Sequence, residues 1–268
     1  GYDTYPPKVL TDQAFLDSLR HKGVDLVFNI HSLSILRRSF LELPRIGCFN
    51  LHPGPLPRYA GLNCPSWAIY RGERTYGVTV HWMVPAIDAG AIAYQSLFPI
   101  QETDTGLSLS TRCIQEGLAL VERVLHDAAR DPASIPRLAQ DLSQREYFGK
   151  AAPEGNRLCW SRPVEAVVNQ VRASCYYPYP SPWGYPLATF DAQPLGIIKA
   201  SRSRQPTEAA PGTVAAGESA ATVRVACADE WMDVELVRFQ GESVAPTKVL
   251  RPGDRLSDGN PDASGHLR

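Results

Sequence analysis

The sequence lacks four features that would each point to a particular class of protein. No apolar run approaches the ~18 residues of a membrane helix, and Gly1-Tyr2-Asp3 has neither the basic nor the apolar region of a signal peptide. The cysteines form no Cys-x-x-Cys pair, which argues against a zinc site and fits reduced thiols in a cytoplasm. They are Cys48, Cys64, Cys113, Cys159, Cys175 and Cys227. A net charge of −1 gives no general attraction to nucleic acid or to an anionic membrane. We therefore expect a soluble cytoplasmic protein with no membrane partner and no metal.

The sequence does contain enough apolar chain for a globular fold. Its 268 residues and 44% hydrophobic content suit one large or two modest domains. In the first half, helical and strand patterns alternate. Helices are expected over 13–22, 66–70 and 107–130, the first capped by Thr11 or Asp12 and ended by Gly23. Strands are expected over 25–30, 48–52, 77–83 and 91–98. This order predicts a parallel-type α/β domain over residues 1–135.

The second half has a different pattern. Residues 136–155 carry weak periodicity and are predicted as a linker. A helix over 163–173 precedes short β-rich segments separated by turn residues, as in a small barrel or sandwich. These segments cover 187–190, 196–200, 212–215, 222–227 and 231–239. We predict a helix-plus-barrel domain over 156–256 and a disordered tail over 257–268.

One motif stands out among these elements. Asn50-Leu51-His52 ends a strand, and side chains two apart on a strand point to the same face. The loop Pro53-Gly54-Pro55-Leu56-Pro57-Arg58-Tyr59-Ala60-Gly61 follows directly. Farther on, Gly77-Val78-Thr79-Val80-His81 reads as a strand that leads to Asp88-Ala89-Gly90. Open α/β sheets place their chemistry at such strand ends, so Asn50, His52 and Asp88 are candidate catalytic residues.

This combination resembles the formyltransferases that use 10-formyltetrahydrofolate, with their pattern Asn-x-His-x-x-x-Leu-Pro-x-Tyr-x-Gly, then Gly-Val-Thr-x-His and Asp-x-Gly. The resemblance implies a Rossmann-like catalytic domain followed, as in methionyl-tRNA formyltransferase-like members, by a helix and an OB-like barrel. Cys159-Trp160-Ser161-Arg162-Pro163 and Pro211-Gly212-Thr213-Val214 resemble that second domain. By the same comparison the strand over 25–30 should be an inner strand, so we expect the opening strands of the domain to be missing from this sequence.

The resemblance also implies a reaction and a donor. An amine would attack the formyl carbon of 10-formyltetrahydrofolate, and Asn50 and His52 would stabilise the tetrahedral intermediate while Asp88 assists proton transfer. Backbone groups around Ser34 and Leu36, and those of Val84, Pro85 and Ile87, would bind the pterin, although Pro85 offers no N–H. No metal is needed, because the formyl group is already activated on the folate nitrogen. Outside that set, we interpret His81 as structural. Cys48 and Cys64 have no activating base nearby in sequence and are poor candidates for a nucleophile.

The sequence leaves the formyl acceptor open. From residue 151 onward there are 12 Lys and Arg against 13 Asp and Glu, whereas a domain that binds a polyanion should be distinctly basic. We therefore rank an amino or hydroxylamino group of a small molecule, or of a carrier-bound amino acid, above methionyl-tRNA and above an amino sugar. A catalytically inactive folate-binding or scaffold protein is the alternative from another class.

Overall fold

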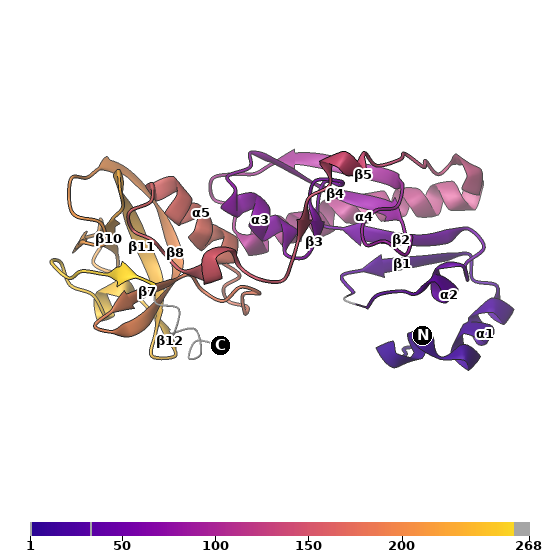
Figure 1. Ribbon diagram of the computed structural model, residues 1–268, viewed down its shortest axis with the longest axis horizontal. Coiled ribbons are helices and arrows are strands. Elements are labelled where there is room, and N and C mark those ends of the chain that lie inside the picture. The colour runs from indigo at the N-terminus through magenta and orange to yellow at the C-terminus, as the bar shows by residue number, and fades with distance from the viewer. Residues whose placement is uncertain (1, 33, 260–268) are drawn as a thin grey trace. The chain divides into compact units, whose positions relative to one another are not determined.

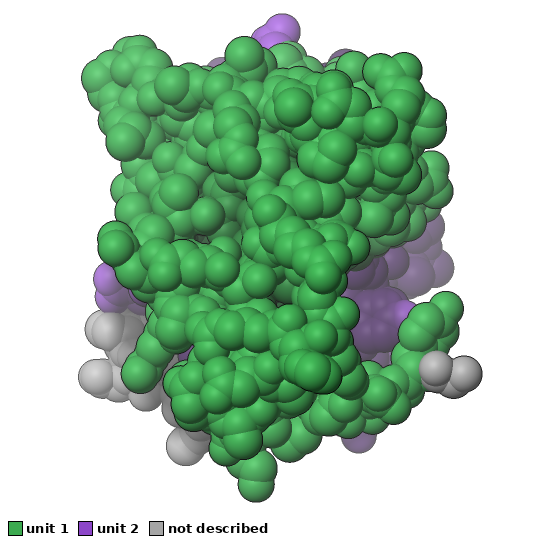
Figure 2. Space-filling view, turned by 90° about the vertical axis from the view of Figure 1, so that its right-hand side faces the viewer, with its two compact units in different colours: residues 1–64, 75–99, 110–148 green, residues 65–74, 100–109, 149–268 purple. Residues whose placement is uncertain are grey.

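The computed structural model describes residues 2–32 and 34–259, and the chain divides into two compact units. Unit 1 comprises residues 1–64, 75–99 and 110–148, and unit 2 comprises residues 65–74, 100–109 and 149–268 (Figure 2). Because the chain passes between the units several times, they are not simply the first and second halves of the sequence. The predicted domain boundaries therefore stay a prediction, and each unit is described by itself.

Unit 1 is built on a four-stranded sheet in the order β1-β2-β4-β5 (Figure 1). Its strands are β1 (Leu26–Ile30), β2 (Gly47–His52), β4 (Thr75–Trp82) and β5 (Ile92–Pro99). Only β1 and β2 pair in parallel, whereas β2–β4 and β4–β5 are antiparallel. The α/β class is confirmed, but the parallel type is wrong for two of the three pairs. An apolar strand buried on both faces looks the same in either direction, so its sequence does not reveal the direction.

The helices of unit 1 start and stop where local chemistry dictates. The carboxylate of Asp12 accepts the N–H of Phe15 at the start of α1 (Gln13–Lys22), and Gly23 ends the helix in a left-handed conformation. A short α2 (Arg38–Leu41) lies between β1 and β2. The long α4 (Gly106–Arg130) belongs to unit 1 from Ser110 onward, and a Cβ added at its Gly117 would lie 2.6 Å from the side chain of Leu51. Leu51 therefore faces α4, and its neighbours Asn50 and His52 face the opposite side of β2.

Residues 136–148 differ from the linker predicted from the sequence. They belong to unit 1, where Leu138 forms an antiparallel bridge to Ile92, and β6 (Tyr147–Phe148) pairs in parallel with β3 (Ala60–Gly61). Because these contacts are single bridges and a two-residue strand, they leave no periodic pattern in the sequence.

Unit 2 contains a curled antiparallel sheet packed against a helix. The strand order is β13-β7-β8-β11-β10-β9, with β12 paired to β11. The elements are α5 (Val164–Ser174), β7 (Leu187–Phe190), β8 (Gln193–Pro206), β9 (Val214–Ala216), β10 (Val223–Ala226), β11 (Glu230–Phe239), β12 (Glu242–Val244) and β13 (Ser257–Asp258). Its core includes Val164, Val168, Ile197, Met232 and Val234. Register shifts between β8 and β11 bend the sheet, and the predicted barrel-like second domain is confirmed.

The remaining elements are short. α3 (Cys64–Tyr70) begins two residues before the predicted helix, and 3₁₀ turns cover Pro7–Thr11, Pro132–Ser134, Leu142–Gln144, Pro153–Asn156 and Pro246–Lys248. Ser257 and Asp258 pair with β7, so the predicted tail is wrong for these two residues, while 260–268 lie outside the described residues. Within residues 2–32 and 34–259, no helix has both the length and the apolar character to cross a membrane.

Candidate active site

The end of β2 carries Asn50 and His52, and the register of the sheet brings His81 beside them. Asn50 of β2 is the partner of His81 of β4, and His52 is the partner of Thr79. A register shift between β4 and β5 falls at Val80 and His81. Such irregularities re-aim side chains and often occur next to active sites. Asn50, His52 and His81 therefore project from the same sheet face, all within unit 1.

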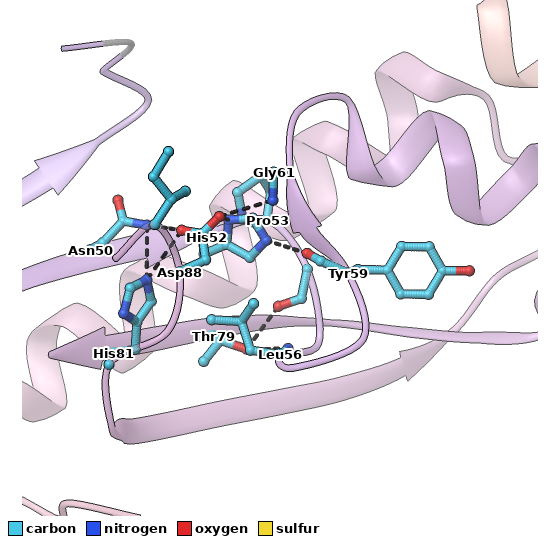
Figure 3. Close-up of polar contacts among 12 residues, drawn as sticks. Asn50, His52, Pro53, Leu56, Tyr59, Gly61, Thr79, His81 and Asp88 are labelled. Carbon is cyan, nitrogen blue, oxygen red and sulfur yellow. Dashed lines mark hydrogen bonds and ion pairs between the residues drawn. The ribbon is translucent and has the colours of Figure 1, made fainter. Parts of the chain in front are cut away.

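Asp88 completes the cluster from the loop between β4 and β5 (Figure 3). One carboxylate oxygen, Oδ1, lies 3.4 Å from Asn50 Nδ2 and 3.5 Å from His81 Nε2. The other, Oδ2, accepts the N–H of Gly61 at 2.9 Å and lies 3.7 Å from His52 Nδ1. The three residues predicted as catalytic are thus brought together, although Asp88 is 36 or more positions from the other two in the sequence.

The surroundings of Asp88 hold it in the charged form. Burial alone would raise the pKa of this carboxyl, but the nearby His81 and His52 side chains and the N–H of Gly61 lower it by more. The pKa of Asp88 is lowered to about 2 as a result. Asp88 is therefore a carboxylate throughout the neutral pH range, and it can orient a histidine or stabilise a nearby cation.

His52 is held as a neutral ring. It is only 3% exposed, and this burial lowers its pKa, while Asp88 and the carbonyl of Tyr59 raise it less. The ring nitrogen Nε2 lies within hydrogen-bond distance of the Tyr59 carbonyl oxygen. A carbonyl oxygen can only accept a hydrogen bond, so Nε2 carries the proton. In the neutral ring, Nδ1 is then an unprotonated nitrogen facing Asp88. His52 therefore has its basic nitrogen beside a carboxylate that would stabilise the protonated ring.

Asn50 and His81 form a second oriented pair. His81 Nδ1 lies 2.9 Å from the carbonyl oxygen of Trp82, so Nδ1 is the protonated nitrogen in the neutral ring. Its Nε2 can then accept a hydrogen from Asn50 Nδ2 at 3.1 Å. Figure 3 shows the Asn50 nitrogen joined to both His81 and Asp88, with its oxygen pointing away from them. The structure places His81 against the Asn50 amide, and its structural role stays a prediction.

The loop after His52 is fixed by buried hydrogen bonds from β4. Thr79 Oγ1 donates to the carbonyl of Gly54 at 2.7 Å and accepts the N–H of Leu56 at 3.2 Å. At the far end of the loop, Gly61 has a φ of +100°, and a Cβ there would lie 2.2 Å from the carbonyl oxygen of Phe148. Only glycine fits this conformation and this approach, which explains why the motif ends in glycine and how its N–H reaches Asp88.

The residues predicted to bind the pterin lie in two loops. Ser34 and Leu36 follow β1, whose residue Asn29 is the register partner of Asn50, so their loop starts beside the catalytic residues. The N–H of Ser34 donates to Ser32 Oγ at 3.1 Å, and Leu36 packs on the cluster around Phe40. The other predicted set, Val84, Pro85 and Ile87, lies in the loop that carries Asp88, and the structure exposes 42% of Val84 and 45% of Ile87. Their role in binding stays a prediction.

The structure gives no support to cysteine or metal chemistry in the part of the chain it describes. Burial raises the pKa of the Cys48 thiol to about 11 and raises the pKa of Cys64 as well, so neither is a ready thiolate. Residues 2–32 and 34–259 contain no group of three or more His, Cys, Asp or Glu side chains that could hold a metal ion. A cavity of about 580 Å³ beside Arg45, Trp82 and Arg137 does not include the catalytic candidates.

Two residues that hold the site were missed by the sequence analysis. Gln140 donates through Nε2 to the carbonyl oxygens of Asp88 at 2.9 Å and Gly90 at 2.6 Å. Arg145 donates through Nη2 to the carbonyl oxygen of Ile87 at 3.0 Å. Both come from the segment predicted as a linker, and a lone Gln or Arg between weakly patterned residues gives no signal of such a contact.

The chain thus combines an α/β unit, in which Asn50, His52 and Asp88 converge at a strand end, with a barrel-like unit. The sequence matches the family model described as formyl transferase over residues 2–125, and the one described as formyl transferase, C-terminal domain, over residues 150–252. The two matches together cover most of the chain, and the chain belongs to the formyltransferase family, a family of formyl-transferring enzymes.

Solved structures share this fold at low sequence identity. An N-formyltransferase from Helicobacter canadensis, in complex with folinic acid and dTDP-3-aminofucose, is 20% identical with a TM-score of 0.60, over 80% of this chain and 75% of that chain. WlaRD, a sugar 3N-formyl transferase studied with dTDP and 5-N-formyl-THF, is 20% identical with a TM-score of 0.61, over 81% and 74%. HypX from Aquifex aeolicus, in complex with tetrahydrofolic acid, is 20% identical with a TM-score of 0.65, over 91% of this chain but 41% of its own. This chain therefore spans less than half the length of HypX.

Proposed function

We propose that this protein transfers the formyl group of 10-formyltetrahydrofolate to a primary amine or hydroxylamine of a small molecule or carrier-bound amino acid. The observation that carries the proposal is the convergence of Asn50, His52 and Asp88 at one strand end, in a chain of the formyltransferase family. The folate ligands of the neighbouring structures, folinic acid, tetrahydrofolic acid and 5-N-formyl-THF, support a folate donor.

The proposed reaction exchanges one carbon–nitrogen bond for another. The amine nitrogen attacks the formyl carbon, and the carbonyl electron pair moves to oxygen to give a tetrahedral intermediate with an oxyanion and an ammonium. The oxyanion then re-forms the carbonyl, and the bond from the formyl carbon to the folate nitrogen breaks. The ammonium loses a proton and the folate nitrogen gains one, so that the products are a formamide and tetrahydrofolate. The protein must stabilise the oxyanion and move this proton.

His52 and Asp88 are suited to the proton transfer. Nδ1 of neutral His52 is the basic nitrogen, and Asp88 Oδ2 lies 3.7 Å from it. When Nδ1 takes the proton of the attacking amine, the resulting imidazolium faces a carboxylate whose pKa is lowered to about 2. The Tyr59 carbonyl keeps the ring in the tautomer that leaves Nδ1 free to accept. His52 can then return the proton to the folate nitrogen as it leaves.

Asn50 is proposed to stabilise the oxyanion. Its Nδ2 is shared between His81 at 3.1 Å and Asp88 at 3.4 Å. The longer of these contacts is the weaker, and donating to an oxyanion would replace it while the contact to His81 keeps the amide in orientation. Removal of one such donor typically costs about 10²–10³ in rate.

The two loops proposed for the folate offer suitable groups. Val84 and Ile87 leave apolar side chains exposed beside Asp88, where they would pack on the pterin ring. The Ser34–Leu36 loop begins at the neighbouring strand end and offers backbone groups to the ring edge. Pro85 supplies a carbonyl and no N–H, so any backbone donor in that loop comes from another residue.

Charge and the neighbouring structures both bear on the class of acceptor. The near-neutral balance of residues 151–268 disfavours methionyl-tRNA. The complex with dTDP-3-aminofucose belongs to the Helicobacter canadensis protein, and it makes an amino sugar a second candidate for this chain. Both candidates accept the formyl group on a nitrogen atom, and they differ in whether a nucleotide must also be recognised.

A formyl-transfer assay on the purified protein tests the proposal against an inactive folate-binding or scaffold protein. The protein is incubated with 10-formyltetrahydrofolate and panels of amines, amino acids, amino sugars and charged initiator tRNA, and products are read by a mass gain of one formyl group. We expect transfer to a small-molecule amine. Binding of 5-formyltetrahydrofolate, detected as a rise in Tm, without transfer to any acceptor would instead favour the inactive folate-binding protein.

A further inference from the structure

Residues 136–148 connect the two loops that the active site depends on. Gln140 and Arg145 contact the loop that carries Asp88, and the carbonyl of Glu146 accepts the N–H of Ala60 at 2.9 Å, next to Gly61. We propose that Gln140 is a positioning residue for formyl transfer, which fixes the backbone at Asp88 so that the carboxylate faces His52. The inference rests on the proposed function, because it assigns a role within the same site.

The loop requires such support because its backbone conformation is unfavourable. Asp88 has a φ of 53°, in the left-handed region that costs a non-glycine residue about 1 kcal/mol or more. Within the loop itself, the N–H of Ala89 donates to the carbonyl oxygen of Ala86 at 3.4 Å, which is long for a hydrogen bond. The conformation that aims Asp88 at His52 is therefore maintained by contacts from elsewhere in the chain.

The side-chain amide of Gln140 is placed to hold the backbone on both sides of Ala89. Its Nε2 donates to the carbonyl oxygens of Asp88 and Gly90, at 2.9 and 2.6 Å, on the two sides of Ala89. An amide has two N–H donors, so both are used on this one loop. The reversed orientation would place the Gln140 oxygen against two carbonyl oxygens, so the donor assignment is determined by its partners.

The oxygen of the Gln140 amide lies in an unfavourable environment. Its oxygen Oε1 is buried and has no hydrogen-bond partner among the described residues. A buried acceptor left unpaired costs about 1–3 kcal/mol. The side chain thus tolerates an unfavourable environment for its oxygen while its nitrogen holds Asp88 and Gly90. A glutamine present only to fill space would gain by being replaced with an apolar residue of similar shape.

The segment that carries Gln140 is itself anchored on both sides. The bridge between Leu138 and Ile92 has two hydrogen bonds, of 2.8 and 3.0 Å, and ties the segment to the start of β5. Farther along, β6 pairs with β3, which ends in Gly61. Gly61 supplies the N–H to Asp88 Oδ2. The backbone around Gln140 is therefore held in place by other contacts. Loss of the Gln140 amide would free the Asp88 backbone, while residues 136–148 would stay attached to β3 and β5.

The experiment compares Gln140→Met, which keeps the side-chain volume and removes the donors, with Gln140→Ala and the control Gln144→Ala. Gln144 is an exposed glutamine of the same segment. We expect kcat for formyl transfer to fall about 10- to 100-fold in Gln140→Met, the size expected when a catalytic group is misplaced. The KM for the formyl donor should change less than about threefold, since the contact of Arg145 with Ile87 is retained. Gln144→Ala should match the wild type.

Hydrogen exchange supplies a readout that does not require activity. In Gln140→Met, the peptide covering residues 84–92 should exchange faster than in the wild type, while the peptide covering β2 is unchanged. Wild-type kcat together with unchanged exchange of 84–92 in Gln140→Met would overturn the positioning role. If the wild type transfers no formyl group to any acceptor, the proposed function fails by itself, and the exchange of 84–92 then decides the role of Gln140. If Gln140→Ala does not fold, the volume-preserving Gln140→Met still gives both readouts.

Discussion

His52 places its two ring nitrogens in different environments, and this difference explains how one residue can handle a proton twice. Nε2 is committed to the Tyr59 carbonyl, while Nδ1 faces Asp88 at 3.7 Å. Burial lowers the pKa of the ring, so His52 is neutral and able to accept a proton at neutral pH. The proposed acceptor amine must also be neutral to attack, so transfer should rise with pH until that amine is deprotonated.

Substitution of the three proposed catalytic residues tests this assignment at the residue scale. Asn50→Ala, His52→Ala and Asp88→Ala should each lower kcat by about 10²–10³ or more, because each removes a group that stabilises charge formed in the transition state. The effects should not multiply in double variants, since the three act as a unit. Kinetics on folded protein, checked by circular dichroism, give the measurement.

The matched control for that series is His126→Ala, since the His126 side chain is 71% exposed on α4. If His52→Ala fails to fold because a buried ring is lost, His52→Gln retains much of the volume. Wild-type turnover in a His52 variant would contradict the proposed role.

The lowered pKa of Asp88 predicts how stability depends on pH. The pKa is about 2 in the folded protein and 3.8 in an unperturbed aspartate. Below pH 4 the unfolded chain binds this proton first, so the contribution of Asp88 is fully present above that pH and is lost as the pH falls towards 2. The contribution is about 2–3 kcal/mol, from ~1.4 kcal/mol for each pKa unit.

Urea unfolding of the wild type and Asp88→Asn between about pH 6 and pH 2.5 measures this contribution. The asparagine variant cannot titrate at this position, so the difference in unfolding free energy between the two proteins should shrink as the pH falls. A difference that stays constant over this range would mean that the folded state does not lower the pKa of Asp88.

At the scale of elements, β4 has two roles. It pairs with β2 and β5, and its residue Thr79 holds the loop that follows His52. Thr79 is fully buried, and its hydroxyl bonds to Gly54, Leu56 and the Nε2 of Gln95. This explains the threonine of the Gly-Val-Thr motif, because valine would have the same shape without the hydrogen bonds.

Thr79→Val should therefore destabilise the protein by about 1–3 kcal/mol, the cost of leaving buried polar groups without partners. The control Thr75→Val lies on the same strand at an exposed position. Denaturant midpoints of both variants measure the effect, and kcat of Thr79→Val should also fall because the Tyr59 carbonyl, which orients His52, belongs to the same loop. Equal midpoints for the two variants would show that the Thr79 hydroxyl does not support the loop.

At the scale of the whole molecule, charge is the feature that bears on the acceptor. Several arginines of unit 2 are already paired with carboxylates, which leaves less positive charge for a polyanion. These pairs are Arg162–Glu154, Arg202–Glu230, Arg204–Glu102 and Arg224 with both Glu218 and Asp233. Their pairing agrees with the near-neutral count of charged residues from 151 onward.

We predict that kcat/KM is higher for a small-molecule amine than for methionyl-tRNA, and that transfer depends weakly on salt. A protein that neutralises 6–10 phosphates loses about 10³–10⁵ in affinity between about 50 and 200 mM salt. The same assay with charged initiator tRNA and small amines, run at both salt concentrations, gives the comparison. Efficient formylation of methionyl-tRNA with a steep loss at the higher salt would reverse our ranking of acceptors.

The sequence determined much of this protein by itself. The boundaries of α1, including its cap and its terminal glycine, follow from local hydrogen bonds and backbone preferences. The spacing of Asn50 and His52 places both on one face of β2, since strand periodicity is local as well. The ordered motifs around them were specific enough to indicate the family. In each case the information lies within a few neighbouring residues.

Only the tertiary structure decided how distant segments meet. The antiparallel direction of β4, which puts His81 beside Asn50, depends on how strands with similar apolar patterns pair in space. The contacts of Gly61 and Gln140 with the Asp88 loop join segments separated by 27 and 52 residues. A hydrogen bond at such a separation needs only one suitable donor and one acceptor, so it leaves no repeat or spacing in the sequence. Its existence is set by the packing of the whole unit.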